Sequence, residues 1–350
     1  MIPTTPGSPA TIGRYPVSRR LGAGAFASVW LGRDTEFDVD VAIKVLADNW
    51  SADPAIRERF LTEAKFLRRI RDRRVVHVYD IGALDDGRPY FVMDYLDAGS
   101  LEDLRRSGVA PTEALRLCAE AARGLEVLHR HHLVHRDVTP GNLLLTSRPD
   151  GTRAVVVADL GVARSVLDSS AGAMVVGTPS YMAPEQAGGG AVDHRADVYA
   201  LCAVAYALLA GGPPFPVLTI ADLTSRPAEL GPPPLAERLG APATLDGLFL
   251  SGLATDPHRR PPSAALLAEA FDQLADELAG GPQRTVETSG AGERQRHRET
   301  APVAPVAPVP PAGRPEPRPP GRSSAFYIAM TVLAVVVFAA FLGIVIAVSL

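Results

Sequence analysis

The part of the chain that most constrains its fold and chemistry is the polar run His135-Arg136-Asp137-Val138-Thr139-Pro140-Gly141-Asn142. It follows a predicted amphipathic helix and precedes a buried strand pattern, Val155-Val156-Val157-Ala158, that ends in Asp159. Asp137, Asn142 and Asp159 together offer two carboxylates and one amide carbonyl. Such oxygen donors suit Mg²⁺, which keeps several waters and shares the phosphates of its substrate. The run therefore favours metal-assisted chemistry on a phosphate compound.

A glycine-rich segment, Leu21-Gly22-Ala23-Gly24-Ala25-Phe26-Ala27-Ser28-Val29, lies near the beginning of the chain. Glycines let a backbone turn tightly and approach a phosphate closely. Alone this is a weak signal, because Ala27 replaces the third glycine of G-x-G-x-x-G and most glycine-rich turns are only turns. A dinucleotide-binding fold needs a helix directly afterwards, whereas Ser28-Val29-Trp30-Leu31 has a strand pattern. The segment is therefore predicted to join two strands.

Lys44 and Glu63 are predicted to meet between a strand and a helix. Lys44 lies inside the alternating pattern Val41-Ala42-Ile43-Lys44-Val45-Leu46, where it needs an anion unless it reaches solvent at an edge. The next helix begins near Asp53-Pro54, and one of its faces carries Ile56, Phe60, Glu63, Leu67 and Ile70. A lone buried carboxylate is costly, so Lys44 is the expected partner. A solvated Glu63 at the helix edge is the alternative.

Taken in order, these segments resemble the eukaryotic-like, Hanks-type Ser/Thr protein kinase family that bacteria carry. The motifs of that family are a glycine-rich loop, V-A-I-K, H-R-D-x-x-x-x-N, D-F-G and A-P-E. The last two correspond here to Asp159-Leu160-Gly161 and to the end of Gly177-Thr178-Pro179-Ser180-Tyr181-Met182-Ala183-Pro184-Glu185. The resemblance covers roughly 15–278. The segments Met93-Asp94-Tyr95 and Asp197-Val198-Tyr199 also resemble the membrane-anchored branch.

The resemblance implies an α+β, two-lobed protein kinase fold. A small β-rich N-lobe would span about 15–95 and a larger helical C-lobe about 96–278, after a flexible N-terminus at 1–14. The implied catalytic residues are Asp137, which would accept or orient the substrate hydroxyl proton, and Lys44, Glu63 and Asn142. Asn142 and Asp159 would hold Mg²⁺, with Mn²⁺ as an alternative ion.

The resemblance also implies an ATP site and a set of supporting residues. The ATP-binding residues would be Leu21, Gly22, Gly24, Val29, Ala42, Lys44, Met93, Asp94, Leu96 and Leu144. The structural and activating residues would be Arg136, Thr178, Glu185, Asp197 and Arg260, with Glu185 and Arg260 as a buried pair. Ser169 and Ser170 are the expected regulatory phosphosites, and a phosphate there would pair with Arg136.

The implied activity is ATP-dependent transfer of the γ-phosphate to Ser/Thr hydroxyls of proteins, including autophosphorylation of the activation segment. Three departures from the family pattern are Ala27, Leu160 for phenylalanine, and Thr139 for a lysine near the transferred phosphate. They leave open a catalytically weak pseudokinase that acts as a membrane-tethered scaffold. A small-molecule phosphotransferase is disfavoured by the intact G-T-x-x-Y and A-P-E pattern.

The C-terminal part of the sequence predicts a spacer and a membrane span. Residues 279–325 are rich in Pro and Arg and poor in large apolar side chains, which predicts a disordered linker. Residues 326–348 carry no charge and would cover about 34 Å as a helix, close to the bilayer thickness. Arg314, Arg318 and Arg322 precede this span, so the kinase domain would be cytoplasmic at a single-pass plasma-membrane anchor.

The composition excludes several classes of protein and of binding partner. With 35 Lys and Arg against 39 Asp and Glu, the formal net charge is −4, which excludes a strongly basic nucleic-acid binder. A hydrophobic content of 47% excludes global disorder. The two cysteines, Cys118 and Cys202, fit neither a metal spacing nor a disulfide scaffold. The expected partners are protein substrates and, through 326–348, a lipid bilayer; a homodimer is left open.

Overall fold

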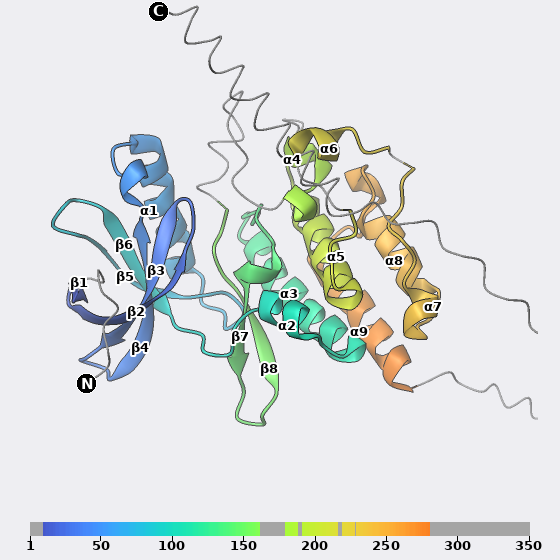
Figure 1. Cartoon of the computed structure of the whole chain (residues 1–350), viewed down its shortest axis with the longest axis horizontal. Coiled ribbons are helices and arrows are strands. Elements are labelled where there is room, and N and C mark those ends of the chain that lie inside the picture. Colours follow the sequence, from blue (N-terminus) through green and yellow to red (C-terminus); the bar gives the residue numbers. More distant parts are fainter. Residues whose placement is uncertain (1–9, 162–178, 188–190, 216–218, 228, 281–350) are drawn as a thin grey trace, which may run out of the picture. The chain divides into compact units, whose positions relative to one another are not determined.

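A six-stranded antiparallel sheet forms the N-terminal part of the computed structural model, which describes residues 10–161, 179–187, 191–215, 219–227 and 229–280 (Figure 1). The strand order is β1-β2-β3-β4-β6-β5. The strands are β1 (Thr11–Ile12), β2 (Tyr15–Ala23), β3 (Ala27–Asp34), β4 (Val39–Leu46), β5 (Val78–Ala83) and β6 (Pro89–Asp94). Ile12 is buried in this sheet, so ordered structure begins inside the segment 1–14 that was expected to be flexible.

One long helix, α1 (Pro54–Arg69), packs against β5 and β6. It begins as the sequence predicts, because the Asp53 side chain accepts hydrogen bonds from the first free backbone N–H groups and proline occupies the first turn. Its buried face includes Phe60, whose ring lies 5.0 Å from that of Phe91 on β6. Glu63 lies on the same buried face, so α1 carries a carboxylate into the interior.

The C-terminal part is helical around α3 (Pro111–Arg130), which packs along α5 (Arg195–Ala210) and α9 (Ala264–Gly280). It also packs on the small sheet of β7 (Leu143–Ser147) and β8 (Arg153–Val157) (Figure 1). α5 is apolar on nearly all sides and is buried from Ala196 to Leu208, so the core of this part surrounds it. The remaining α-helices of this part are α2 (Leu101–Ser107), α4 (Pro184–Ala187), α6 (Ile220–Thr224), α7 (Ala236–Leu239) and α8 (Thr244–Gly252).

The two parts are joined by backbone contacts as well as by side chains. Val75, in the connection after α1, forms a parallel bridge with Val157 of β8, and the Val76 N–H donates to the Val157 carbonyl at 2.9 Å. This β-rich part and this helical part have the two-lobed α+β architecture that was expected. No helix within the described residues is long and apolar enough to span a membrane. The predicted span 326–348 lies outside those residues.

Candidate active site

Lys44 lies between two carboxylates from different elements. Its Nζ atom, on β4, is 2.9 Å from Oε1 of Glu63 on α1 and 3.0 Å from Oδ1 of Asp159, just after β8. The exposed fraction of the side chain is 12% for Lys44 and 1% for Glu63, but 37% for Asp159. The expected contact of Lys44 with Glu63 is therefore present, and the alternative of a solvated Glu63 is wrong.

Burial and charge act in opposite directions on this cluster. Burial lowers the pKa of Lys44, but the charges of Asp159 and Glu63 outweigh it and raise that pKa above its usual value. Burial raises the pKa of Glu63, and the attraction of Lys44 only partly offsets the increase. Lys44 is thus a fixed ammonium at neutral pH, and its side facing Asp159 is the part nearest to solvent.

Asp197 holds the loop that carries Asp137. Its buried carboxylate, on α5, accepts hydrogen bonds at 2.8 Å from the backbone N–H groups of His135 and Arg136. It also lies 2.8 Å from Nε2 of His129. Arg136 has a positive φ of 64°, an uncommon conformation for a residue other than glycine. The buried carboxylate therefore stabilises a strained backbone directly before Asp137.

Asn142 fixes the side chain of Asp137. The Asn142 Nδ2 atom donates to the backbone oxygen of Asp137 at 2.8 Å and to its Oδ2 atom at 2.9 Å. Because the amide nitrogen faces Asp137, the amide oxygen points elsewhere and is the atom suited to a cation. The backbone oxygen of Asn142 accepts from Ala158 N at 3.0 Å, which places Asn142 beside the strand end that carries Asp159.

Asn142 and Asp159 fit the ligand set that Mg²⁺ prefers. An amide oxygen and a half-exposed carboxylate leave room for waters and substrate phosphates, as this ion requires. Among the described residues, no group of three or more His, Cys, Asp or Glu side chains is arranged to hold a metal by protein ligands alone. Asp159 has a φ of 55°, which Asp tolerates better than most residues and which directs its carboxylate toward Lys44.

Gly161 allows the Asp159 segment to lie against the Asp137 loop. Its N–H donates to the His135 carbonyl at 2.9 Å. A Cβ atom at this position would lie 2.8 Å from Cβ of Asp137 and 3.0 Å from the His135 carbonyl oxygen. Only glycine therefore fits between the two segments without moving Asp137.

The residues expected around a nucleotide base lie on adjoining elements. Ala42 on β4 pairs with Met93 on β6, and Val29 lies on β3 next to β4. Val29, Leu96 and Leu144 are partly buried and pack against the main hydrophobic core. This arrangement supplies an apolar surface beside Lys44.

The expected phosphate-covering loop is the turn between β2 and β3. Leu21 and Gly22 lie near the end of β2, and the Gly24 N–H donates to the Ala27 carbonyl at 2.8 Å. Asp94 was also expected at the ATP site, but its side chain serves another purpose. Its Oδ2 atom accepts from the His77 N–H at 2.8 Å, and Oδ1 contacts the Tyr79 hydroxyl, so this carboxylate braces β5.

Glu185 and Arg260 form the expected pair in the helical part. Arg260 donates to Glu185 from Nη1 at 2.6 Å and from Nη2 at 2.8 Å, and its side chain is fully buried. Sequence reasoning missed the next residue, Gln186, whose Nε2 atom donates to the Arg136 carbonyl at 2.9 Å. Its position directly after A-P-E was the available signal. Ser169, Ser170 and Thr178 lie outside the described residues.

His135 is fully buried directly before Arg136 and Asp137. Its Nε2 atom donates to the Ala158 carbonyl at 2.9 Å, and Nδ1 accepts from the Asp137 N–H at 3.3 Å, an arrangement that requires the neutral ring. Burial lowers the pKa of His135 below its usual 6.5. Since the unfolded chain binds the proton more readily, stability is complete above pH 6.5 and falls as pH decreases toward the folded-state pKa.

We expect a slope of up to about 1.4 kcal/mol per pH unit from His135 below pH 6.5. Urea unfolding of the wild type and of His135→Gln between pH 5 and 8 measures it. The variant should be less stable throughout and should have a shallower slope below pH 6.5. Equal slopes in the two proteins would show that His135 is not the responsible group.

Comparison with known proteins gives matches over most of the chain. A family model described as "Protein kinase domain" matches residues 15–270. The serine/threonine-protein kinase PknB of Mycobacterium leprae is 36% identical over 271 residues, which cover 75% of this chain and 43% of the relative. PknF of Mycobacterium tuberculosis is 35% identical over 266 residues, which cover 74% of this chain and 55% of the relative. The chain thus spans about half the length of these relatives.

A solved structure is also similar over the described part. The crystal structure of the Mycobacterium tuberculosis PknI kinase domain has a TM-score of 0.59 and 33% sequence identity. The match covers 75% of this chain and 97% of the solved chain. The similarity therefore includes both the sheet and the helical part on which the site is built.

Proposed function

The chain belongs to the protein kinase domain family, and we propose that it transfers the γ-phosphate of ATP to Ser and Thr hydroxyls of proteins. The observation that carries the proposal is the position of Lys44, held at 2.9 Å from Glu63 and 3.0 Å from Asp159. One of these carboxylates fixes the ammonium, and the other is suited to a metal ion. The phosphates of ATP can thereby be held by the Lys44 ammonium and the metal ion together.

Each motif residue of the site would have its own role in phosphoryl transfer. Lys44 would hold the α- and β-phosphates, and Asn142 Oδ1 and Asp159 would hold Mg²⁺. The bound ion would supply positive charge that stabilises the negative charge developing on the transferred group. Asp137, oriented by the amide of Asn142, would position the substrate hydroxyl and accept its proton. The waters that surround these groups would be displaced when nucleotide and substrate bind.

Two departures from the family pattern bear on the rate. Thr139 removes a cation that the family places near the transferred phosphate, and Ala27 puts a buried methyl group at the start of β3, directly after the phosphate-covering loop. We expect Thr139 to lower the rate and Ala27 to stiffen the loop or weaken nucleotide affinity modestly, without loss of activity, because Lys44, Glu63, Asp137, Asn142 and Asp159 are all retained. This retained set disfavours the pseudokinase alternative.

The test is incorporation of labelled phosphate by the full chain with Mg-ATP, into itself and into a protein acceptor rich in Ser and Thr. We expect phosphoserine and phosphothreonine by mass spectrometry, with Ser169 and Ser170 among the modified positions. The matched control is Thr139→Ser. It keeps a hydroxyl at this position and adds no cation, so it should retain the activity of the wild type. A folded wild type that incorporates no phosphate above a sample without Mg²⁺ would overturn the proposal.

The proposed location is the plasma membrane, with residues 326–348 as a single span and the kinase domain in the cytoplasm. The support is the uncharged stretch of 23 residues, preceded by Arg314, Arg318 and Arg322. The linker 279–325 would connect domain and span.

The full chain should be extracted from membranes only by detergent, because salt screens surface charge but does not extract a spanning helix. After deletion of residues 326–350, 1 M salt should release the protein from membranes. The measurement is membrane fractionation with salt and detergent washes. Catalytic activity should be unchanged by the deletion. If salt alone extracts the full chain, residues 326–348 are not a span.

A further inference from the structure

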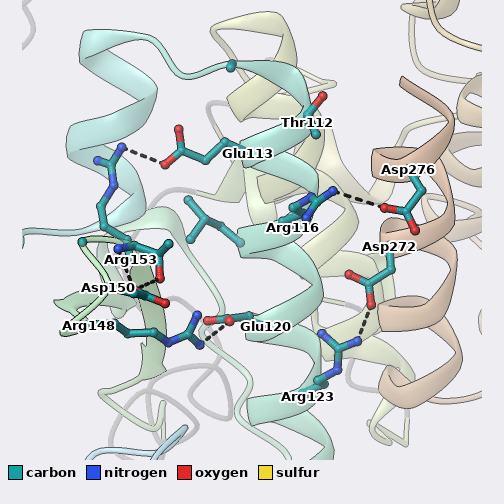
Figure 2. Close-up of a pocket in the computed structure, with 14 residues that line it drawn as sticks. Thr112, Glu113, Arg116, Glu120, Arg123, Arg148, Asp150, Arg153, Asp272 and Asp276 are labelled. Atoms are coloured by element: carbon teal, nitrogen blue, oxygen red, sulfur yellow. Dashed lines mark hydrogen bonds and ion pairs between the residues drawn. The ribbon is translucent and has the colours of Figure 1, made fainter. Parts of the chain in front are cut away.

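Arginines on one side of the helical part are compensated by acidic partners. A groove of about 940 Å³ lies between α3, the β7–β8 turn and α9 (Figure 2). Each of its four arginines has a carboxylate partner, in the pairs Arg116–Asp276, Arg123–Asp272, Arg148–Glu120 and Arg153–Glu113. The groove is wide, but its charges are satisfied within the chain.

The segment 65–74 is different. It contains six cations and one acid, and that acid, Asp72, accepts from the N–H of Arg74 and contacts its guanidinium. Among the described residues, Lys65, Arg69, Arg71 and Arg73 have no acidic partner, and all four are exposed. Cations left unpaired in a chain of net charge −4 form a local surface of the opposite sign.

The C-terminal end of α3 extends this surface. Arg130, which is exposed, and Arg74 line the same hollow of about 270 Å³, together with Arg123. The one carboxylate that lines the hollow, Glu126, accepts a hydrogen bond from the Ala265 N–H at the start of α9. Arg123 and Arg74 are paired with Asp272 and Asp72, so Arg130 is the arginine of the hollow that extends the unpaired charge of segment 65–74 among the described residues.

An exposed aromatic ring lies beside these cations. Arg68 donates from Nη1 to the backbone oxygen of Tyr79, and Tyr79 is 51% exposed, with its hydroxyl donating to Asp94. Aromatic side chains with a polar tip are enriched where protein meets the headgroup region of a bilayer. We define the basic face as Lys65, Arg68, Arg69, Arg71, Arg73, Arg74 and Arg130.

We propose that the basic face binds the anionic headgroups of a phospholipid bilayer. The seven long cationic side chains come from α1, the following connection and the end of α3, and so many charges suit several headgroups rather than a single small anion. A membrane span at 326–348 would hold the domain close to such a surface and raise its local concentration. The proposal goes beyond the proposed function, and only its choice of partner draws on the proposed anchor.

The test uses residues 1–286, a compact unit that contains every described residue and lacks the proposed span. Binding to vesicles of phosphatidylcholine with 30% phosphatidylserine is measured by co-sedimentation, with pure phosphatidylcholine vesicles as the reference. Each basic side chain near an anionic surface contributes roughly fivefold in affinity. Arg69→Gln, Arg71→Gln and Arg73→Gln together should therefore weaken binding on the order of 100-fold.

The matched control removes the same charge elsewhere, with Arg33→Gln, Arg106→Gln and Arg116→Gln, whose wild-type side chains have acidic partners. It should change vesicle affinity by less than about threefold, and 0.5 M salt should abolish wild-type binding. Equal losses in the two triple variants, or no preference of the wild type for anionic vesicles, would overturn the proposal.

A phosphorylated peptide that binds the basic face more tightly than anionic vesicles do would also overturn it and identify a protein partner. The vesicle arms need no variant, so they remain informative if a variant is poorly folded. Phosphate transfer by residues 1–286 in solution does not depend on the basic face. Failure of lipid binding is therefore distinguishable from failure of the kinase proposal.

Discussion

Asp137→Asn is expected to lower the turnover number of phosphate transfer by about 10³-fold. The amide cannot accept the hydroxyl proton, and general-base catalysis typically contributes 10²–10⁴-fold. The Asn142 Nδ2 donor, 2.9 Å from Asp137 Oδ2 in the wild type, can keep an oxygen of the new amide as its partner. Folding and ATP affinity should therefore change little. The measurement is steady-state kinetics with the concentration of ATP and of protein acceptor varied separately.

The control for this variant is Asp150→Asn, an acid in the β7–β8 turn that accepts hydrogen bonds from the backbone N–H and the hydroxyl of Thr152. It should retain wild-type turnover. An Asp137→Asn protein within tenfold of the wild type in turnover would contradict the assigned role. An equal decrease in KM and in the turnover number, which leaves their ratio unchanged, would instead indicate that the substrate binds in a nonproductive position.

Lys44→Met is expected to lower the turnover number by about 10³-fold, because a preorganised cation beside the phosphates is lost. It also leaves Glu63 buried without its cation. The pKa of Glu63, already raised to about 7 by burial, should rise further in this variant. The carboxyl group can then take up a proton near neutral pH, which limits the loss of stability to roughly 1–3 kcal/mol.

The pH dependence of this variant follows from the direction of that shift. Because the folded-state pKa of Glu63 lies above its unfolded value, the contribution of Glu63 to the stability of Lys44→Met should be greatest below about pH 4.5 and decrease as pH rises toward the folded-state pKa. The double variant Lys44→Met, Glu63→Gln should lose this dependence and recover stability, yet remain inactive. Recovery of activity in the double variant would contradict the role of Lys44 in holding phosphate.

Much of the site could be predicted because its residues stand in short ordered patterns. The alternation around Lys44 and the spacing of Glu63 on a buried helix face were enough to expect their contact. The pair of Glu185 and Arg260 followed from the resemblance alone, since 75 residues separate the two positions and no local pattern links them. The α+β division into a β-rich and a helical part followed from the same motifs.

Other features depend on tertiary geometry that no local pattern encodes. The left-handed backbone of Arg136 and Asp159 is maintained by Asp197 and by the packing of Gly161 against the Asp137 loop. Sequence alone gave no reason to expect strain at residues with ordinary backbone preferences. The bracing role of the Asp94 side chain depends on the register of β5 against β6, which aligns it with His77.

The basic face also could not be predicted from the sequence. Arginine-rich segments are usually solvated, and the sequence does not say which cations will find acidic partners. Only the arrangement in space separates the paired arginines of the groove in Figure 2 from the unpaired ones of segment 65–74.

The most direct test of the central claim is calorimetric titration of the protein with ATP, with and without Mg²⁺. The claim is that Lys44 and a divalent ion held by Asn142 and Asp159 act on one nucleotide. Mg²⁺ should strengthen ATP binding by the wild type at least tenfold, and Asp159→Asn should remove that gain while Asp137→Asn keeps it. Identical ATP affinities with and without Mg²⁺ in the wild type, or an undiminished gain in Asp159→Asn, would contradict the account.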